Sequence, residues 1–225
     1  IKIPPSVKSI NLFAFYGCTS LIRIEIPSVK SIDDYAFFNC SSLLEVLIPS
    51  SVTSIGLNAF LKCSSLEKVE ILSSVTSIPN GIFCDCSSLK QITIPPSITK
   101  IGMNSFNGCS SLTQIEIPSS VNSIGSYSFN GCISLKQIII PSSVNSIGAG
   151  AFSGCSSLTT IEIHSLITSL EESVFEGCNS LNEIEIPITV TVIKNKAFKN
   201  CSSLKQIKIP PSVKSINFCA FYGCS

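Results

Sequence analysis

Residues 146–163, SIGAGAFSGCSSLTTIEI, are one copy of a pattern that recurs along the whole chain. The pattern places a phenylalanine three residues before a cysteine and a leucine three residues after it. It ends in two isoleucines that are separated by one residue. A repeat of about 23 residues cannot bury its own apolar face. The recurrence therefore predicts a solenoid whose stacked copies share one core. The cysteine column has one step of 22 residues and eight of 23, and consists of Cys18, Cys40, Cys63, Cys86, Cys109, Cys132, Cys155, Cys178, Cys201 and Cys224.

The end of each copy, L-x-x-I-x-I, predicts a short β-strand. Alternation of β-branched residues with other residues is typical of a strand that has one buried face. Proline follows directly in most copies. Because proline has no backbone N–H to donate, it ends the strand. Strands of neighbouring copies would pair in parallel at about 4.8 Å. Leu72 and His164 replace the proline in two copies; we interpret the replacements as conservative within a core, and His164 itself as a solvated turn residue.

The segment around the cysteine predicts a turn. Phenylalanine, cysteine and leucine recur there at intervals of three, which is the spacing of a helical or 3₁₀ turn. The residue before the cysteine is glycine in six copies, asparagine in two, aspartate in one and lysine in one. Most of these residue types tolerate a positive φ, so this position is interpreted as the left-handed residue that ends the turn.

The two halves together predict an α/β solenoid. We expect a curved, right-handed array with a parallel β-sheet on its concave face and short helical or 3₁₀ turns on its convex face, because the turn half is the wider one. Residues 1–225 form a single array of about ten 23-residue copies without obvious terminal caps. Residues 1–19 nearly duplicate residues 207–225, so we expect the chain to be an excerpt of a longer array.

Composition argues against several classes of function. The formal net charge is +1 and the lysines are scattered, so nothing indicates nucleic-acid binding. No run reaches the ~18 to 20 apolar residues of a membrane-spanning helix, so no direct membrane insertion is expected, and no targeting signal is visible. His164 is the only histidine, and no catalytic motif surrounds it. We therefore predict a protein without enzymatic activity, catalytic residues or a cofactor.

The cysteines are interpreted mainly as buried free thiols that act as small hydrophobic side chains. Stacked cysteines would have parallel Cβ vectors, which is poor geometry for a disulfide. No paired motif or histidine partner completes a metal site, so none is predicted. Two of the twelve cysteines lie outside the column, at positions where other copies carry mostly polar residues. These two, Cys84 and Cys219, are predicted to be surface thiols.

The repeated signature IPSSVTSIGxxAFxGCSSLxxIxI resembles the BspA-like (Treponema-type) class of leucine-rich repeats over the whole chain, and residues 146–163 are close to a consensus copy. The resemblance implies a leucine-rich repeat fold. It also implies a bacterial or protist surface protein, located at the cell surface or secreted, that adheres to host cells, matrix proteins or other microbes.

The outward side chains of the predicted strands are the best candidates for a binding site. In L-x-x-I-x-I the residue before the first isoleucine and the residue between the two point away from the core. These positions vary between copies, whereas the inward ones hardly change. The predicted ligand-binding residues on the concave face are Arg23, Glu25, Glu45, Leu47, Lys68, Glu70, Gln91, Gln114, Glu116, Gln137, Ile139, Glu162, Glu183 and Glu185.

A rigid frame with a varied polar surface favours a non-enzymatic module that recognises a protein or a glycan, with cell adhesion or host-protein recognition as its role. Two alternatives remain open. The matching, uncapped ends could stack copies end to end into a homo-oligomeric structural array. The many free thiols would also suit a cytoplasmic scaffold for protein–protein interaction.

Overall fold

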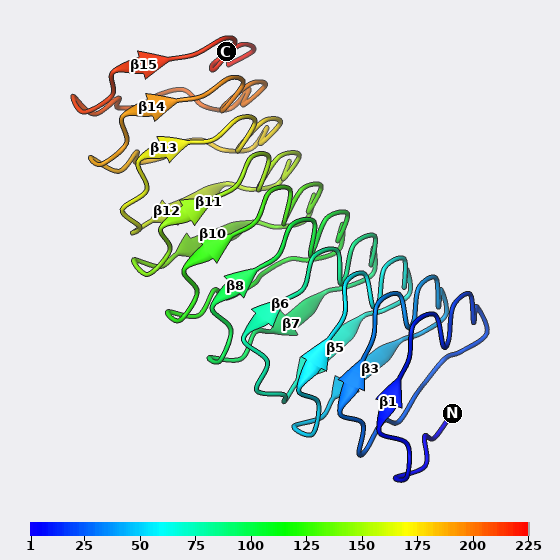
Figure 1. Ribbon diagram of the computed structural model, residues 1–225. Helices are drawn as coiled ribbons and strands as arrows, with labels where there is room; N and C mark the ends of the chain where they lie inside the picture. Colours follow the sequence, from blue (N-terminus) through cyan, green and yellow to red (C-terminus); the bar gives the residue numbers. More distant parts are fainter. Residues whose placement is uncertain (225) are drawn as a thin grey trace.

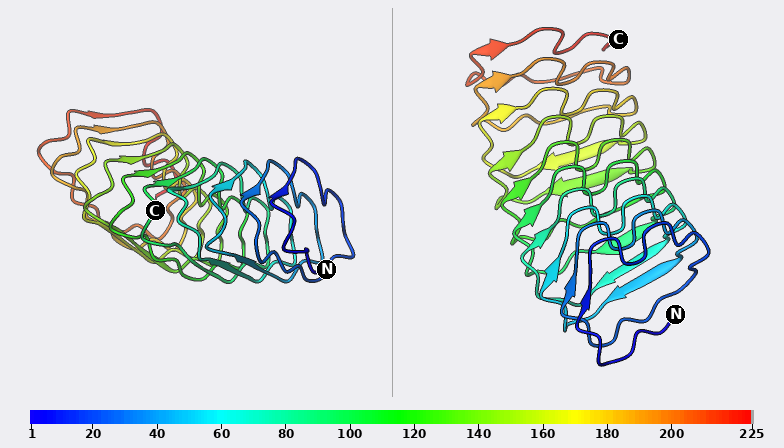
Figure 2. Two further views of the ribbon diagram at one scale, coloured as in Figure 1. Left: turned by 60° about the horizontal axis from the view of Figure 1, so that its bottom comes forward. Right: turned by 45° about the vertical axis from the view of Figure 1, so that its right-hand side comes forward.

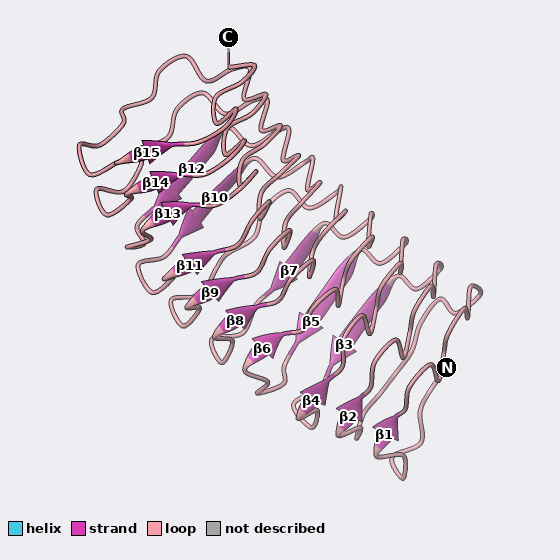
Figure 3. Ribbon diagram, turned by 45° about the horizontal axis from the view of Figure 1, so that its top comes forward, coloured by secondary structure: helices cyan, strands magenta, loops and turns pink. Residues whose placement is uncertain are grey.

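The computed structural model describes residues 1–224, which wind into one stack of coils with the two termini at its opposite ends (Figure 1). The coils change their orientation along the stack, so the array is not straight (Figure 2). Among the described residues the regular elements are short strands, which pair in parallel, and no helix is present (Figure 3). The parallel repeat solenoid is thus confirmed, whereas the helical or 3₁₀ turns are not.

The L-x-x-I-x-I segments form the longer strands, as predicted. Neighbouring strands are offset by one whole repeat, so that Lys68 lies opposite both Glu45 and Gln91. Isolated bridges extend the same register toward both ends of the array, for example between Arg23 and Glu45 and between Glu185 and Lys208. The longer strands are β3 (Glu45–Ile48), β5 (Lys68–Ile71), β7 (Gln91–Thr93), β10 (Gln137–Ile140) and β12 (Thr160–Ile163).

A second set of strands, which sequence analysis did not predict, lies on another side of the coils. Each is only two residues long, and in most copies it consists of the Ser-Ile pair before the turn. A pair of residues is too short to show an alternating pattern, so only the pairing of stacked copies reveals it. The short strands are β1 (Ser9–Ile10), β2 (Ser31–Ile32), β4 (Ser54–Ile55), β6 (Ser77–Ile78), β8 (Lys100–Ile101), β9 (Ser123–Ile124), β11 (Ser146–Ile147), β13 (Ser169–Leu170), β14 (Val192–Ile193) and β15 (Ser215–Ile216).

The two sets of strands are interrupted at different places. The short strands form the sheets β1-β2-β4, β11-β9-β8-β6 and β13-β14-β15, and the longer strands form β3-β5-β7 and β10-β12. Where the short strands of neighbouring copies do not pair, the longer strands beside them do. Where the longer strands do not pair, the short strands do. Residues 114–117 carry the strand sequence, yet among the described residues no ladder hydrogen bond joins them to β7 or β10.

The two gaps between the short strands coincide with the copies that lack the proline. Where proline is present it starts a turn, as in the 3.0 Å hydrogen bond from the Val52 N–H to the Pro49 carbonyl. The copies with Leu72 and His164 lack this bond among the described residues, and both side chains are exposed. The interpretation of Leu72 as a conservative core change was wrong, because the position faces solvent and the proline defines the turn, whereas His164 is exposed as expected.

The turn half has no helix because it contains two left-handed residues four positions apart. One precedes the cysteine, as predicted, and has positive φ in all ten copies, from Gly17 to Gly223. The other is occupied by residues as large as Phe13, Tyr35 and Tyr127, with φ of 57°, 54° and 55°. A right-handed helix cannot pass through such a residue without substantial cost. The bulk of these residues hid the second left-handed position from sequence analysis.

Backbone N–H groups of the turn alternate between two kinds of partner. The Phe129 N–H donates to the Ala151 carbonyl of the next copy at 2.8 Å, and the Gly131 N–H donates to Ser153 at 2.8 Å. The Cys132 N–H, by contrast, bonds locally to the Phe129 carbonyl at 3.2 Å. Since a helix would satisfy its N–H groups internally, the alternation is what ties each turn to the next one.

Phenylalanine and cysteine fill the core beside this network. Nine consecutive ring pairs, from Phe15 to Phe221, stack with centroids 4.9 to 5.8 Å apart. Each column cysteine from Cys40 to Cys224 donates its S–H to the phenylalanine carbonyl of the preceding copy, at 3.1 to 3.3 Å. The thiols thus link the copies as well as filling space.

We predict that Phe129→Ala lowers the free energy of unfolding by about 3–5 kcal/mol. Phe129 is fully buried and stacks on Phe106 and Phe152, so truncation leaves a cavity between two copies. Phe218→Ala is the control, because its side chain is 71% exposed; it should change the stability by no more than about 0.5 kcal/mol. Urea denaturation followed by circular dichroism measures both, and similar losses in the two variants would contradict the prediction.

Candidate functional site

The longer strands present one face to the core and one to solvent. In β5 the Lys68 and Glu70 side chains are exposed, whereas Val69 and Ile71 are buried. The strands β3 and β10 have the same pattern. This alternation follows from the two-residue period of a strand, so the outward side chains form a continuous surface along the array. We call the surface formed by the outward side chains of the L-x-x-I-x-I segments the groove face.

All fourteen side chains that sequence analysis predicted for ligand binding are exposed on the groove face. Two of them are apolar, Leu47 with 48% and Ile139 with 54% exposure. About half of each of these two side chains is therefore available for contact with a ligand. Exposure places these residues in a position to bind, while their role stays a prediction.

Two open hollows lie on the groove face. The first has a volume of about 420 Å³ and is lined by charged residues, including Arg23, Glu45 and Lys68, and by Leu47. The second, which we call the central hollow, has a volume of about 1110 Å³ and extends from Lys68 to Glu162. The groove face is therefore hollowed along much of its length. Both hollows are open rather than enclosed, so they suit a large ligand better than a small one.

Not every predicted residue belongs to a hollow. Glu183 and Glu185, at the C-terminal end of the groove face, line neither of them. Conversely, Leu72 lines the central hollow with 53% exposure, although we had assigned it to the core. Its position directly after the strand, where other copies carry a turn proline, is the signal that could have placed it there.

Ion pairs on the groove face gather toward its N-terminal end. The Arg23 and Glu45 side chains approach to 3.5 Å, and Lys68 and Glu70 to 4.0 Å. Farther along the array, His164 lies 3.2 Å from Glu162. These side chains are all more than 45% exposed, so the pairs add little to stability and can exchange partners at small cost.

Comparison with known proteins agrees with this architecture. The family profile described as "BspA type Leucine rich repeat region (6 copies)" matches residues 1–113 and 99–225. The chain belongs to the BspA-type leucine-rich repeat family. A search of functionally curated proteins found no match.

Several solved structures resemble this BspA-type array. A leucine-rich repeat protein from Bacteroides ovatus is 27% identical with a TM-score of 0.55, and the alignment covers 100% of this chain and 84% of that one. The Treponema pallidum leucine-rich repeat protein is also 27% identical, with a TM-score of 0.52 over 90% and 76% of the two chains. The pneumococcal vaccine antigen PcpA shares the fold at 21% identity, with a TM-score of 0.52 over 96% and 77%.

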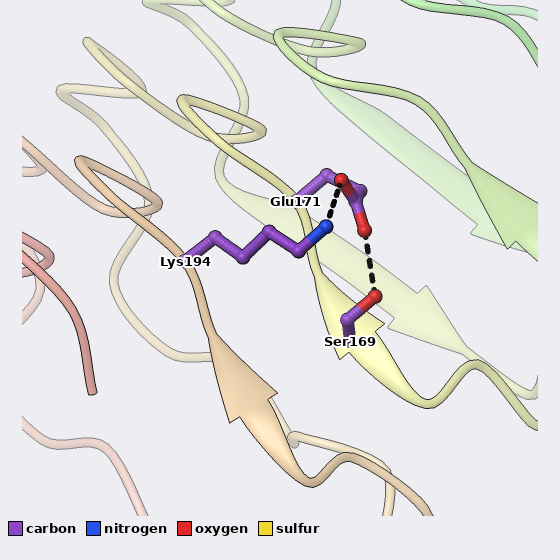
Figure 4. Close-up of polar contacts among 3 residues, drawn as sticks. All are labelled: Ser169, Glu171 and Lys194. Atoms are coloured by element: carbon purple, nitrogen blue, oxygen red, sulfur yellow. Dashed lines mark hydrogen bonds and ion pairs between the residues drawn. The ribbon is translucent and has the colours of Figure 1, made fainter. Parts of the chain in front are cut away.

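The best-buried ion pairs of the BspA-type array lie in its turn half, away from the groove face. Figure 4 shows the Glu171 carboxylate between the Lys194 ammonium, at 2.7 Å, and the Ser169 hydroxyl, at 2.6 Å. Burial alone would raise the pKa of Glu171, but both hydrogen bonds and the Lys194 charge hold the pKa below its usual range. Lys194 belongs to the next copy, so the pair links two copies, and we assign it a structural role.

The two thiols outside the cysteine column are partly accessible to solvent. Cys84 and Cys219 are both half-buried. Burial, and then the charge of Asp85, raise the pKa of Cys84 to about 11, although Lys62 opposes the shift. Its thiolate is therefore scarce at neutral pH, which disfavours a reactive role.

Other kinds of site find no support in the described part of the chain. No group of three or more His, Cys, Asp or Glu side chains among residues 1–224 could hold a metal ion. In the same range, no helix is long and apolar enough to span a membrane. The groove face is therefore the surface on which a function can be argued.

We predict that only the half-buried thiols react with a thiol reagent such as DTNB in the native protein at neutral pH. The eight others are fully buried and donate to carbonyls, so they should react only on unfolding. The number of thiols that react with DTNB is measured once in buffer and once in guanidinium. The difference gives the thiols that react only on unfolding. Replacing Cys84 and Cys219 by serine should remove two equivalents from the fraction that reacts in the native state, with Cys84 reacting slowly because its pKa is raised to about 11. Rapid labelling of all twelve thiols in the native state would contradict this account of the cysteine column.

Proposed function

We propose that this chain is a non-enzymatic recognition module that binds a protein or glycan through the groove face, as part of a cell-surface or secreted protein involved in adhesion. The observation that carries the proposal is the contrast between the two faces of one strand. Inward positions hold the same apolar types in every copy, whereas outward positions include cations, anions, amides and exposed aliphatic side chains. A fixed frame with a varied surface is how solenoids present binding sites.

The shape of the groove face favours a large, elongated ligand. The two hollows follow one another along the array and share Lys68 and Glu70 in their linings. Together they extend over the outward side chains from Arg23 to Glu162. An open surface of this length offers many moderate contacts instead of one enclosed pocket, which suits macromolecular recognition.

The extracellular part of the proposal rests on the family. Membership of the BspA-type family favours a surface or secreted location, because homologues of this type are cell-surface proteins. Adhesion supplies the reason for a rigid array, since a preorganised surface loses little conformational entropy when it binds.

Charge exchange on the groove face tests the proposal. The variant Lys68→Glu/Glu185→Lys keeps the net charge and alters only exposed side chains of the groove face. Immobilised wild-type protein, exposed to extracts of host cell surfaces and extracellular matrix, should retain a saturable partner that the variant binds at least about tenfold more weakly. The matched control Lys214→Glu/Glu172→Lys changes two exposed charges outside the groove face and should bind like wild type.

Crosslinking locates the contact independently. A photoreactive amino acid at Gln114 on the groove face should crosslink to the retained partner, whereas the same group at Asn107 in the turn half should not. Equal retention by the two charge-exchange variants, or crosslinking from Asn107 alone, would overturn the groove face as the binding surface.

A further inference from the structure

The centre of the groove face differs chemically from its ends. Between the Lys68–Glu70 pair and the Glu162–His164 pair, Glu116 is the only charged side chain that lines the central hollow. The remaining outward side chains there are uncharged, and except for Ile139 each carries an amide or a hydroxyl group: Gln91, Thr93, Gln114, Gln137 and Thr160.

These polar groups are unoccupied by the protein itself. Among residues 1–224, no hydrogen bond or ion pair engages the side chains of Gln91, Gln114, Gln137 or Glu116. Each glutamine amide offers two donors and one carbonyl acceptor, and the carboxylate offers acceptors only. The central hollow therefore presents a set of free donors and acceptors with little net charge, which is the complement of a ligand rich in hydroxyl groups.

The glutamines recur with the period of the array. Gln91 lies in the register position of Lys68, and Gln137 in that of Thr160, so the amides mark the same outward column in successive copies. Paired strands place adjacent positions of one column roughly 5 Å apart, as for Lys68 and Gln91 or for Gln137 and Thr160. Gln114 occupies the same position in the copy between them. Identical groups at a regular spacing match a ligand built of identical units more naturally than a peptide whose side chains change at each residue.

The floor of the hollow offers additional hydrogen-bonding groups. Residues 114–117 lie in the gap between β7 and β10, and in the described chain no ladder bond reaches them from either strand. Backbone groups that lack a protein partner are costly unless water or a ligand satisfies them. Ile139 beside this gap provides an apolar contact for the C–H face of a ring.

A peptide has no comparable way to bind here. The usual mode for an extended peptide is addition to the free edge of a sheet, where main-chain hydrogen bonds supply the affinity. The flanking strands β7 and β10 each pair on one side only, with β5 and β12, and the copy that contains residues 114–117 lies between their two unpaired edges. The edges are therefore not open to an added strand, and the outward surface consists of side chains. A peptide lying on that surface would leave most of its own amide groups without main-chain partners.

We propose that the central hollow binds an uncharged, linear, hydroxyl-rich polymer, that is, a neutral glycan. The inference rests on the proposed recognition function and specifies its ligand class. Glutamine amides bond to hydroxyl groups of successive sugar units, Glu116 accepts from neighbouring hydroxyl groups, and Ile139 packs against a ring. No charge on the ligand is required, since Lys68, Glu70 and Glu162, which border the hollow, can bond to hydroxyl groups of the same polymer.

Calorimetric titration with defined oligosaccharides tests the ligand class. Neutral probes are cellohexaose, laminarihexaose and mannohexaose; the charged probe is hexagalacturonate, and the peptide probe is an uncharged decamer of serine, threonine and glutamine. At least one neutral hexasaccharide should bind. The triple variant Gln91→Ala/Gln114→Ala/Gln137→Ala should bind it about tenfold or more weakly, because it loses three hydrogen-bonding groups.

Gln206→Ala is the matched control, because Gln206 is an exposed member of the same column outside both hollows. It should bind the hexasaccharide like wild type, and circular dichroism should show that the triple variant stays folded. The proposal is overturned if no neutral hexasaccharide binds, if hexagalacturonate or the peptide binds more tightly, or if the triple variant matches wild type.

The two proposals can fail separately. If no neutral hexasaccharide binds but the captured partner is still lost by Lys68→Glu/Glu185→Lys, the groove face recognises another ligand and only the glycan assignment fails. If the captured partner is retained equally by that variant and the hexasaccharides do not bind, both proposals fail.

Discussion

The alternating hydrogen bonds of the turn half are the interaction on which the rest of this structure depends. Every second N–H group in the turn donates to the next copy, as Phe129 and Gly131 do, and the intervening groups close the turn locally. The arrangement requires two left-handed residues in each copy, which excludes a helix. Because the bonds repeat with the chain, each copy fixes the position of its neighbour, and the stacked phenylalanines are held in contact.

The strands can therefore be short and discontinuous without loss of the array. Pairing between the longer strands lapses around residues 114–117, and pairing between the short strands lapses after β4 and after β11. In each case the other strand set and the turn ladder keep the copies in register. Because this cohesion comes from backbone bonds and inward side chains, the outward side chains of the groove face are free to vary. They differ from copy to copy over an almost constant core.

Much of this organisation could be predicted from sequence, because one period recurs ten times. Each position of the repeat can therefore be judged from ten residues instead of one. The buried phenylalanine and cysteine columns, the longer strands, the left-handed residue before the cysteine and the outward side chains were all correct. The helical turn was wrong, because Phe13, Tyr35 and Tyr127 do not signal a left-handed residue. The short strands and the gaps between them depend on pairing between copies, which no single repeat encodes. The central hollow was missed for the same reason, although its outward residues were named.

Amide hydrogen exchange tests most directly whether the turn half holds the array while the groove face is free to vary and bind. The account predicts strong protection of the N–H groups that donate between turns, such as those of Phe106, Phe129 and Phe152. It predicts much faster exchange for residues 114–117, with new protection there when a ligand occupies the central hollow. The account would be contradicted if exchange were slow in residues 114–117 of the free protein and fast in the turns.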